Sequence, residues 1–171
     1  MDTLTLEKEV ESQTLVRFPD CDPFNHLNNS KYIDYIINAR EDQLLKYYDI
    51  DIHKMVKESG LTWVVAQNTI SYIVPADIME TVTIQTRLLS FNEKTLLFEA
   101  LMWDKDKRII KAVLWSKQAH YNLQTKRSHQ HSDEFMDFFK SIHFPLPDNI
   151  TFDDRVRSLK LQNIRQWKQT I

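Results

Sequence analysis

Five residues whose side chains could take part in hydrolysis stand close together near the N-terminus. Two carboxylates, an imidazole and two amides fall within ten residues: Asp20, Asp22, His26, Asn28 and Asn29. A carboxylate can attack a carbonyl carbon or activate water, and a histidine can transfer protons. Backbone N–H groups at a helix start can stabilise the negative charge that develops on the carbonyl oxygen. The segment therefore holds the groups that acyl transfer to water requires.

The pattern on either side predicts the elements that position this segment. The run from Glu11 to Phe18 predicts a strand. Asn28, Asn29 and Ser30 are all N-cap types, and apolar residues then recur at helical spacing to about Tyr48. The candidate residues would thus lie in a loop between a strand and a long helix, where functional groups often occur.

Four further strands are predicted after the single glycine, Gly60. They run over Thr62 to Val74, Thr81 to Leu89, Lys94 to Trp103, and Arg108 to Leu123. The short connections leave no room for helices between these strands, so the pattern favours an antiparallel sheet with one helix packed across it. The predicted fold class is α+β.

Two motifs carry a resemblance to a known family. The segment Asp20-Cys-Asp-Pro23, followed by His26, Asn28, Asn29 and Tyr32, resembles the signature of hotdog-fold thioesterases, and the 4-hydroxybenzoyl-CoA-thioesterase-like branch is closest. The run 70–76 is similar to the family strand that ends in Tyr-x-x-Pro-Ala. The resemblance implies a hotdog fold, an antiparallel sheet of about five strands wrapped around one long helix, over residues 1–125. Residues 126–171 would form a C-terminal helical extension.

The resemblance also implies an activity, hydrolysis of acyl-CoA or acyl-carrier-protein thioesters without metal or other cofactor. Asp22 matches the catalytic carboxylate, either as nucleophile or as general base, and backbone N–H groups near Asn28 and Asn29 would form the oxyanion hole. From the residues alone, Asp22 could instead form an Asx-turn before the helix. Asp20 fits a structural or orienting role better than catalysis.

His26 leaves three roles open: catalysis, substrate contact, or a hydrogen bond within the loop. Plant acyl-carrier-protein thioesterases resemble this segment as well, but they pair the histidine with an asparagine at the position of Phe24. Asn25 stands where the hotdog pattern usually has glycine. Asparagine tolerates the left-handed conformation better than most residues, so the turn is expected to form. With one glycine in the chain, Asn and Asp should supply most such positions.

Three other residues are candidate substrate contacts. Tyr32 is expected in the core and could also line an acyl tunnel. Gln67 and Asn68 interrupt an otherwise apolar strand. One of them could reach the thioester from the sheet, although such residues more often face solvent.

Cysteine and histidine content argues against other chemistries. The carboxylates next to Cys21, the only cysteine, should raise its pKa, so a structural role is expected. His129 and His131 lie in a polar turn without metal-ligand spacing, and we interpret them as solvated loop residues rather than metal ligands.

The last third predicts two helices. Ser132 can cap a short helix, and a weaker amphipathic helix should begin near Asp153. Its apolar face would hold four residues, Val156, Leu159, Ile164 and Trp167, and its basic face, from Arg155 to Lys168, is expected to be solvated. Contact of that face with CoA phosphates or an acidic carrier protein is the alternative.

Length and net charge limit the number of domains and the kinds of partner. The 171 residues suit one domain plus a tail, and a net charge of -2 gives no reason to expect nucleic acid. No secretory signal or membrane span is evident, which with one cysteine predicts a cytoplasmic protein.

The resemblance implies a homodimer or homotetramer. Two alternatives to hydrolysis remain: a non-catalytic acyl-thioester-binding module, or an enoyl-thioester hydratase or dehydratase, which the Asp22 to His26 spacing disfavours.

Overall fold

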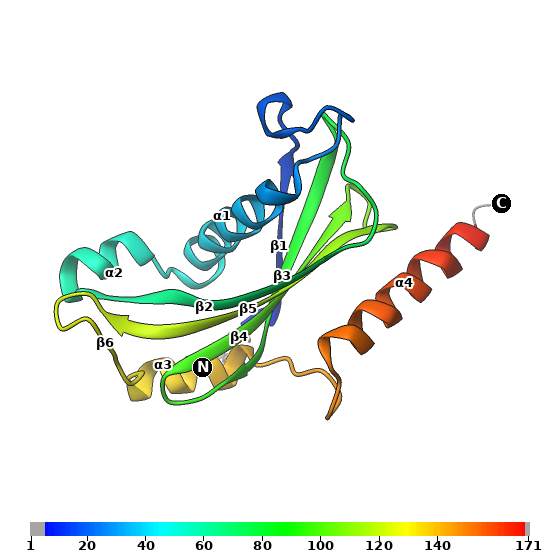
Figure 1. Cartoon of the computed structure of the whole chain (residues 1–171). Coiled ribbons are helices and arrows are strands. Elements are labelled where there is room, and N and C mark those ends of the chain that lie inside the picture. The colour runs from blue at the N-terminus through cyan, green and yellow to red at the C-terminus, as the bar shows by residue number, and fades with distance from the viewer. Residues whose placement is uncertain (1–5, 170–171) are drawn as a thin grey trace.

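The strands predicted from alternating apolar residues pair in one antiparallel sheet, which curls around the long helix (Figure 1). The computed structural model describes residues 6–169. The strand order is β1-β3-β4-β5-β2, which leaves β1 and β2 at the edges, and the two-residue strand β6 pairs with β5. The bounds are β1 (Glu9–Leu15), β2 (Leu61–Tyr72), β3 (Thr81–Phe91), β4 (Thr95–Asp104), β5 (Ile110–Asn122) and β6 (Arg127–Ser128).

Helix α1 (Asn29–Tyr48) lies across one face of the sheet. Its buried residues Tyr32, Ile36 and Ala39 belong to the main apolar cluster, together with sheet residues such as Phe98 and Leu114. Asn28 caps the helix start, and Asp49 ends the helix in the left-handed conformation. The predicted hotdog fold is confirmed.

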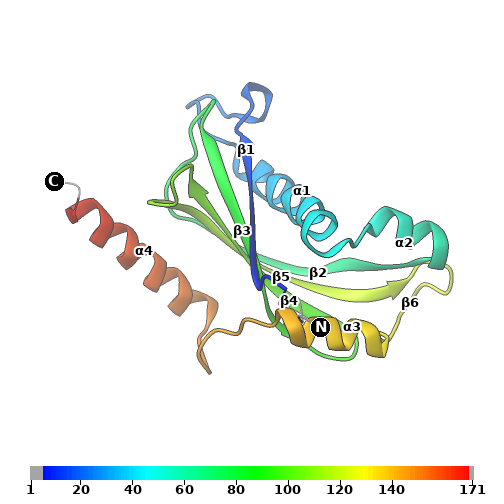
Figure 2. The ribbon, with the colours of Figure 1, turned by 180° about the vertical axis from the view of Figure 1, so that it is seen from behind.

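The two C-terminal helices contact different parts of the sheet. Helix α3 (Asp133–Ile142) buries Phe139 and Ile142 in the same cluster as α1. Helix α4 (Phe152–Gln169) instead packs Leu159 against a second cluster that includes Trp103. Figures 1 and 2 show α1 and α4 on opposite faces of the sheet. We call these the α1 face and the α4 face.

Some elements differ from the predictions. The first strand ends at Leu15, and a short 3-10 helix, Phe18–Asp20, contains Pro19. Helix α2 (Ile52–Ser59) was not predicted; it has no buried residue and is defined mainly by its caps, Asp51 and Gly60. In the described chain only half of the six non-glycine residues with positive φ are Asn or Asp (Asn25, Asp49 and Asn149), and the others are Met79, Lys107 and Lys126.

Two predictions about the C-terminal third were wrong. His131 is 8% exposed and stacks on His120, and its Nε2 accepts a hydrogen bond from Trp63 at 2.9 Å, so it is no solvated loop residue. On α4, Arg155 pairs with the buried Glu99, while Ile164 and Trp167 are 44% and 50% exposed. The reason is that the polar Asn163 occupies a sheet-facing position and bonds both backbone groups of Ile110.

The α-helices of residues 6–169 are α1 to α4. None of the helices in this part of the chain is both long and apolar enough to cross a bilayer.

Candidate active site

The loop between the 3-10 helix and α1 is closed by its own backbone. The N–H of Asp22 donates to the carbonyl oxygen of His26 at 2.8 Å, and the N–H of Asn25 donates to the carbonyl of Asp22 at 3.1 Å. Asn25 has φ of 63°. The left-handed residue expected where relatives carry glycine is therefore present, and the turn is formed with asparagine.

The Asp22 carboxylate is fixed through one of its two oxygens. Oδ1 accepts hydrogen bonds from the N–H of Phe24 at 2.9 Å and from the N–H of His26 at 3.1 Å. Oδ2 has no hydrogen-bond partner among the described residues. This is the Asx-turn geometry considered from the sequence, and it also leaves a carboxylate oxygen in a fixed direction and free to react. The two readings of Asp22 are compatible.

A second loop, residues 76–78, packs against the first. The N–H of Leu27 donates to Ala76 and the N–H of Ile78 donates to Asn25, both at 2.8 Å. This pairing brings His26 Nε2 within 3.6 Å of the Asp77 carboxylate. Sequence reasoning missed Asp77. The available signal was its place directly after the Pro75-Ala76 motif, because that motif ends the strand facing the loop.

The start of α1 offers one unpaired backbone donor. The N–H of Asn28 is bonded to the carbonyl oxygen of Asp20 at 2.9 Å, and the N–H of Ser30 is bonded to the Asn28 side chain at 3.0 Å. The N–H of Asn29 has no bond in the described part of the chain. Of the backbone N–H groups at Asn28 and Asn29, where an oxyanion hole was predicted, only that of Asn29 is unpaired, and it lies at the positive end of the helix dipole. The oxyanion hole itself stays a prediction.

Tyrosines fix the loop and the helix start in place. Tyr72 donates from its hydroxyl to the Asn29 carbonyl at 2.9 Å, and its ring meets that of Tyr32 edge to face. Tyr32 is 2% exposed and its hydroxyl accepts from the N–H of Ala76. Tyr35 donates to Asp20 Oδ2 at 2.8 Å, which agrees with an orienting role for Asp20. Substrate contact by Tyr32 stays a prediction.

Gln67 and Asn68 lie elsewhere on β2. Gln67 is exposed, whereas Asn68 faces α1 opposite Ser116 of β5. Because Asn68 is four residues before Tyr72, it lies about 13 Å along the strand from the helix start. The structure thus brings Asp22, His26, Asn28 and Asn29 together and leaves Gln67 and Asn68 of the same chain apart from them.

The Cys21 thiol lies beside two carboxylates of the same loop. Burial, together with the charges of Asp20 and Asp22, raises the pKa of the Cys21 thiol above its ordinary value, so the thiol stays protonated at neutral pH. Over residues 6–169, no three His, Cys, Asp or Glu side chains are grouped as metal ligands.

A match to a family model shows which superfamily the chain belongs to. A model described as the thioesterase-like superfamily matches residues 16–145. The chain belongs to the thioesterase-like superfamily. The match begins after β1 and extends past the end of α3, so it includes the Asp22 loop, α1 and strands β2 to β6 and leaves out β1 and α4. No curated protein sequence matches the chain.

Several solved structures share the fold with this chain at low sequence identity. SAV2348 from Staphylococcus aureus, solved in complex with CoA, is 13% identical with a TM-score of 0.74 and covers 88% of this chain and 93% of its own. The DHNA-CoA thioesterase from Staphylococcus aureus is 13% identical, with a TM-score of 0.70 and coverage of 90% and 94%. YbaW from Escherichia coli, titled a probable thioesterase, is 21% identical, with a TM-score of 0.67 and coverage of 78% and 98%.

Proposed function

We propose that this member of the thioesterase-like superfamily hydrolyses acyl-CoA or acyl-carrier-protein thioesters at Asp22. One observation carries the proposal: the Asp22 carboxylate is held by two backbone N–H groups through Oδ1 and keeps Oδ2 free. The unpaired N–H of Asn29 at the start of α1 supports it as the donor to the thioester oxygen. A relative solved with CoA supports CoA as the thiol.

Asp22 can act in two ways that balance chemically. As nucleophile, Oδ2 bonds to the carbonyl carbon, the C–S bond breaks, and the thiolate takes a proton; water then cleaves the mixed anhydride. As general base, Asp22 takes a proton from water while the water oxygen bonds to the same carbon, and that proton passes to the thiolate. We assign His26, whose backbone N–H is bonded to Asp22 Oδ1, as the candidate donor of the thiolate's proton in the nucleophilic route.

A homodimer joined through β2 is the assembly we propose. β2 is an edge strand, and its residues Val65, Ala66 and Gln67 are exposed in the single chain. An unpaired edge favours strand addition, and a two-fold axis at this edge closes the assembly. Antiparallel pairing about a two-fold axis near Ile70 would place Gln67 and Asn68 of a second β2 beside Tyr72 and hence toward Asn29, so they could serve the site of the other subunit. Two such dimers would give a tetramer.

Thiol release from a panel of acyl-CoA and acyl-carrier-protein substrates tests the activity. Asp22→Asn is the decisive variant, because an asparagine Oδ1 can still accept the bonds from Phe24 and His26 while its second atom cannot react. We expect kcat/KM to fall on the order of a thousandfold. Asp148→Asn, an exposed aspartate elsewhere, is the matched control and should hydrolyse at the native rate.

Equal rates for the native protein and Asp22→Asn would contradict the mechanism. If neither protein releases thiol and both bind acyl thioesters, the chain is the non-catalytic binding module. Hydration of crotonyl-CoA would instead identify a hydratase.

A further inference from the structure

Buried polar groups without partners gather on the α1 face of the sheet. In the described chain, three buried side-chain atoms have no hydrogen bond: Asn68 Oδ1, Ser116 Oγ and His120 Nε2. Asn68 and Ser116 are cross-strand partners, and all three residues alternate in register with core residues that face α1. Each such atom costs about 1–3 kcal/mol in a dry core, so a concentration on one face calls for a ligand.

Arg40 of α1 is the charged member of this set. It is 8% exposed, donates from Nη1 to Thr86 Oγ1 at 3.1 Å, and lies over the Phe98 ring. No carboxylate of residues 6–169 forms an ion pair with it. Burial lowers the pKa of its guanidinium to about 10, which leaves it charged at neutral pH. A buried cation is normally paired with an anion, and this one has only neutral partners.

Arg40 lines a small internal cavity. The cavity measures about 30 Å³, and its other walls are mainly apolar side chains of α1, the sheet and α3, including Leu44, Leu96 and Phe139. That volume holds about one or two water molecules, so an acyl chain would have to displace side chains to enter. Gln118 contributes a side-chain amide to the cavity wall.

The cavity and the Asp22 loop belong to the same layer between α1 and the sheet. Arg40 lies twelve residues after the N-cap Asn28, about 18 Å along the helix. Along β5, residues Ala112 to Gln118 lead from Tyr72, which contacts the helix start, to the cavity, and they pass Ser116. An acyl chain that follows α1 from the thioester would therefore pass the unpartnered oxygens and end at Arg40.

The outer side of the cavity opposes the entry of an anion. Ile50 and Phe138 separate it from a surface groove of about 490 Å³ between α2 and α3. Four carboxylates and one lysine line that groove: Asp49, Asp51, Glu58, Glu134 and Lys54. Their net negative charge would repel an anion that approached from this side. Entry along α1, from the catalytic end, is the route that the charges allow.

We propose that Arg40 binds the anionic terminus of the substrate's acyl chain, so that the preferred thioesters carry a carboxylate at the end remote from sulfur. The inference rests on the proposed thioesterase function for the route of the chain. The carboxylate would give the guanidinium its missing counter-ion, and an oxygen substituent along the chain could bond Asn68 or Ser116.

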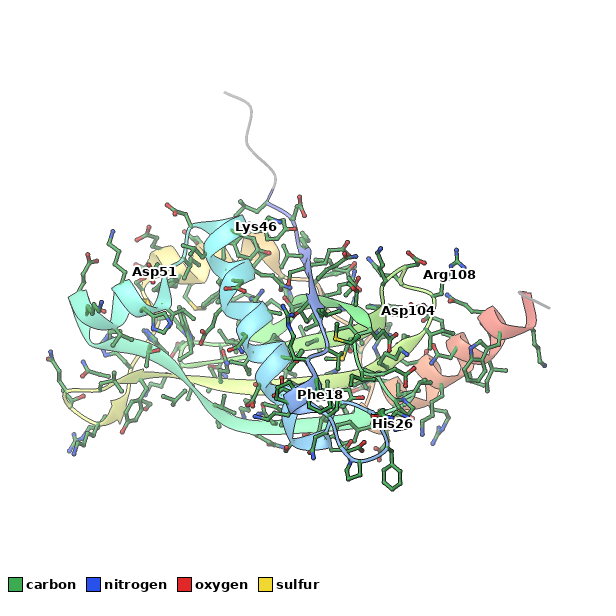
Figure 3. All side chains as sticks on the ribbon, turned by 90° about the horizontal axis from the view of Figure 1, so that it is seen from above. Phe18, His26, Lys46, Asp51, Asp104 and Arg108 are labelled. Atoms are coloured by element: carbon green, nitrogen blue, oxygen red, sulfur yellow. The ribbon has the colours of Figure 1, made fainter. Side chains whose placement is uncertain are left out.

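Two substrates of equal length test the inference. Dodecanoyl-CoA and the monothioester of dodecanedioic acid with CoA differ only at the far end of the chain. The native protein should prefer the dicarboxylic thioester about tenfold or more in kcat/KM, and Arg40→Met should lose that preference. Arg40→Lys should keep part of it. Arg108→Met, which removes an exposed cation of the β4–β5 turn (Figure 3), should leave the ratio as in the native protein.

A second measurement separates this inference from the activity. Calorimetric titration of both thioesters into Asp22→Asn measures their relative affinities without turnover. It therefore tests the role of Arg40 even if the native protein hydrolyses neither thioester. Should Arg40→Met fail to fold by circular dichroism, Arg40→Lys and the cavity-filling Leu44→Phe, which should lower the ratio, take its place.

The inference would be overturned if the native protein hydrolysed the two thioesters with equal kcat/KM, or if the Arg40 variants kept the native ratio. Neither result would contradict thioester hydrolysis by Asp22. Inhibition by free dodecanoate that depends on Arg40, without any preference between the thioesters, would show that the site takes a free carboxylate and would also overturn it.

Discussion

The two faces of the sheet treat buried charge differently. On the α4 face, Glu99 is 1% exposed and bonds Arg87, Arg155 and Trp115. On the α1 face, Arg40 is nearly as buried and has no carboxylate partner among residues 6–169. All the buried unpartnered side-chain atoms of the described chain lie on the α1 face. A face whose polar groups are satisfied by the chain itself is structural, whereas a face with groups left over is suited to a ligand.

Removing Glu99 should have the largest effect on stability and is the most direct way to break the comparison. Glu99→Ala leaves Arg155 without an anion among residues 6–169 and leaves Arg87 only its longer pair with Glu9, at 3.4 Å. We therefore expect the free energy of unfolding to fall by about 3–5 kcal/mol. Urea denaturation measures it. Glu58→Gln, at an exposed site, should change the value by less than about 0.5 kcal/mol. A small loss for Glu99→Ala would mean that the arginines reach solvent and that the two faces do not differ.

Truncating Leu159 should have the next largest effect. Leu159 is 1% exposed and is the main apolar contact of α4 with the sheet. Leu159→Ala should cost about 2–4 kcal/mol in unfolding free energy, because it removes buried methyl groups and leaves a cavity. Thiol release by folded Leu159→Ala should match the native protein, since α4 lies on the face away from Asp22. A selective loss of activity would assign α4 to the site.

Acid should weaken the α1 face first. Burial lowers the pKa of His120 and of His131 in the folded protein. Unfolded histidines titrate near about 6.5, so the unfolded state binds protons first, and the free energy of unfolding should fall as pH drops below about 6.5 toward the folded pKa values. Protonated His131 would also lose the hydrogen bond from Trp63.

Glu99 should respond only at lower pH. Burial acts to raise its pKa, but the bonds and charges of Arg155, Trp115 and Arg87 outweigh burial, and its pKa lies below the ordinary value. Its contribution is therefore complete above the unfolded carboxyl pKa and is lost as pH falls through the folded value. Unfolding measured from pH 8 to pH 3 should show two separate losses, and His131→Gln should reduce only the first. A single loss below pH 4 would contradict the separation.

Neutralising Arg40 should have the smallest effect on stability and sharpen the comparison most. Since the guanidinium has no anion to lose, Arg40→Met should change the unfolding free energy by less than about 1 kcal/mol, or increase it, because a buried charge is replaced by an apolar side chain. Urea denaturation beside Glu99→Ala gives the contrast directly. A loss as large as that of Glu99→Ala would show that Arg40 is a structural residue.

Local sequence features were enough to predict much of the Asp22 loop. The turn at Asn25, the cap at Asn28 and the extent of α1 follow from residue types a few positions apart, and these were predicted correctly. The orienting partner of Asp20 could not be predicted, because Tyr35 lies fifteen positions away and only the helix geometry brings it back. Asp77 was missed for the same reason, since it is fifty-one positions beyond His26.

The sequence by itself determined the order of the elements, the antiparallel sheet and the motif that contains Asp22, because periodicity, turn residues and caps act over short distances. Only the tertiary structure decided which face each polar residue occupies. Arg40 and Arg155 both lie on amphipathic helices, and the local sequence does not distinguish them. Packing places Arg155 against the buried Glu99 and leaves Arg40 without an anion among residues 6–169. That difference arises from contacts between residues far apart in the chain, which no local pattern encodes.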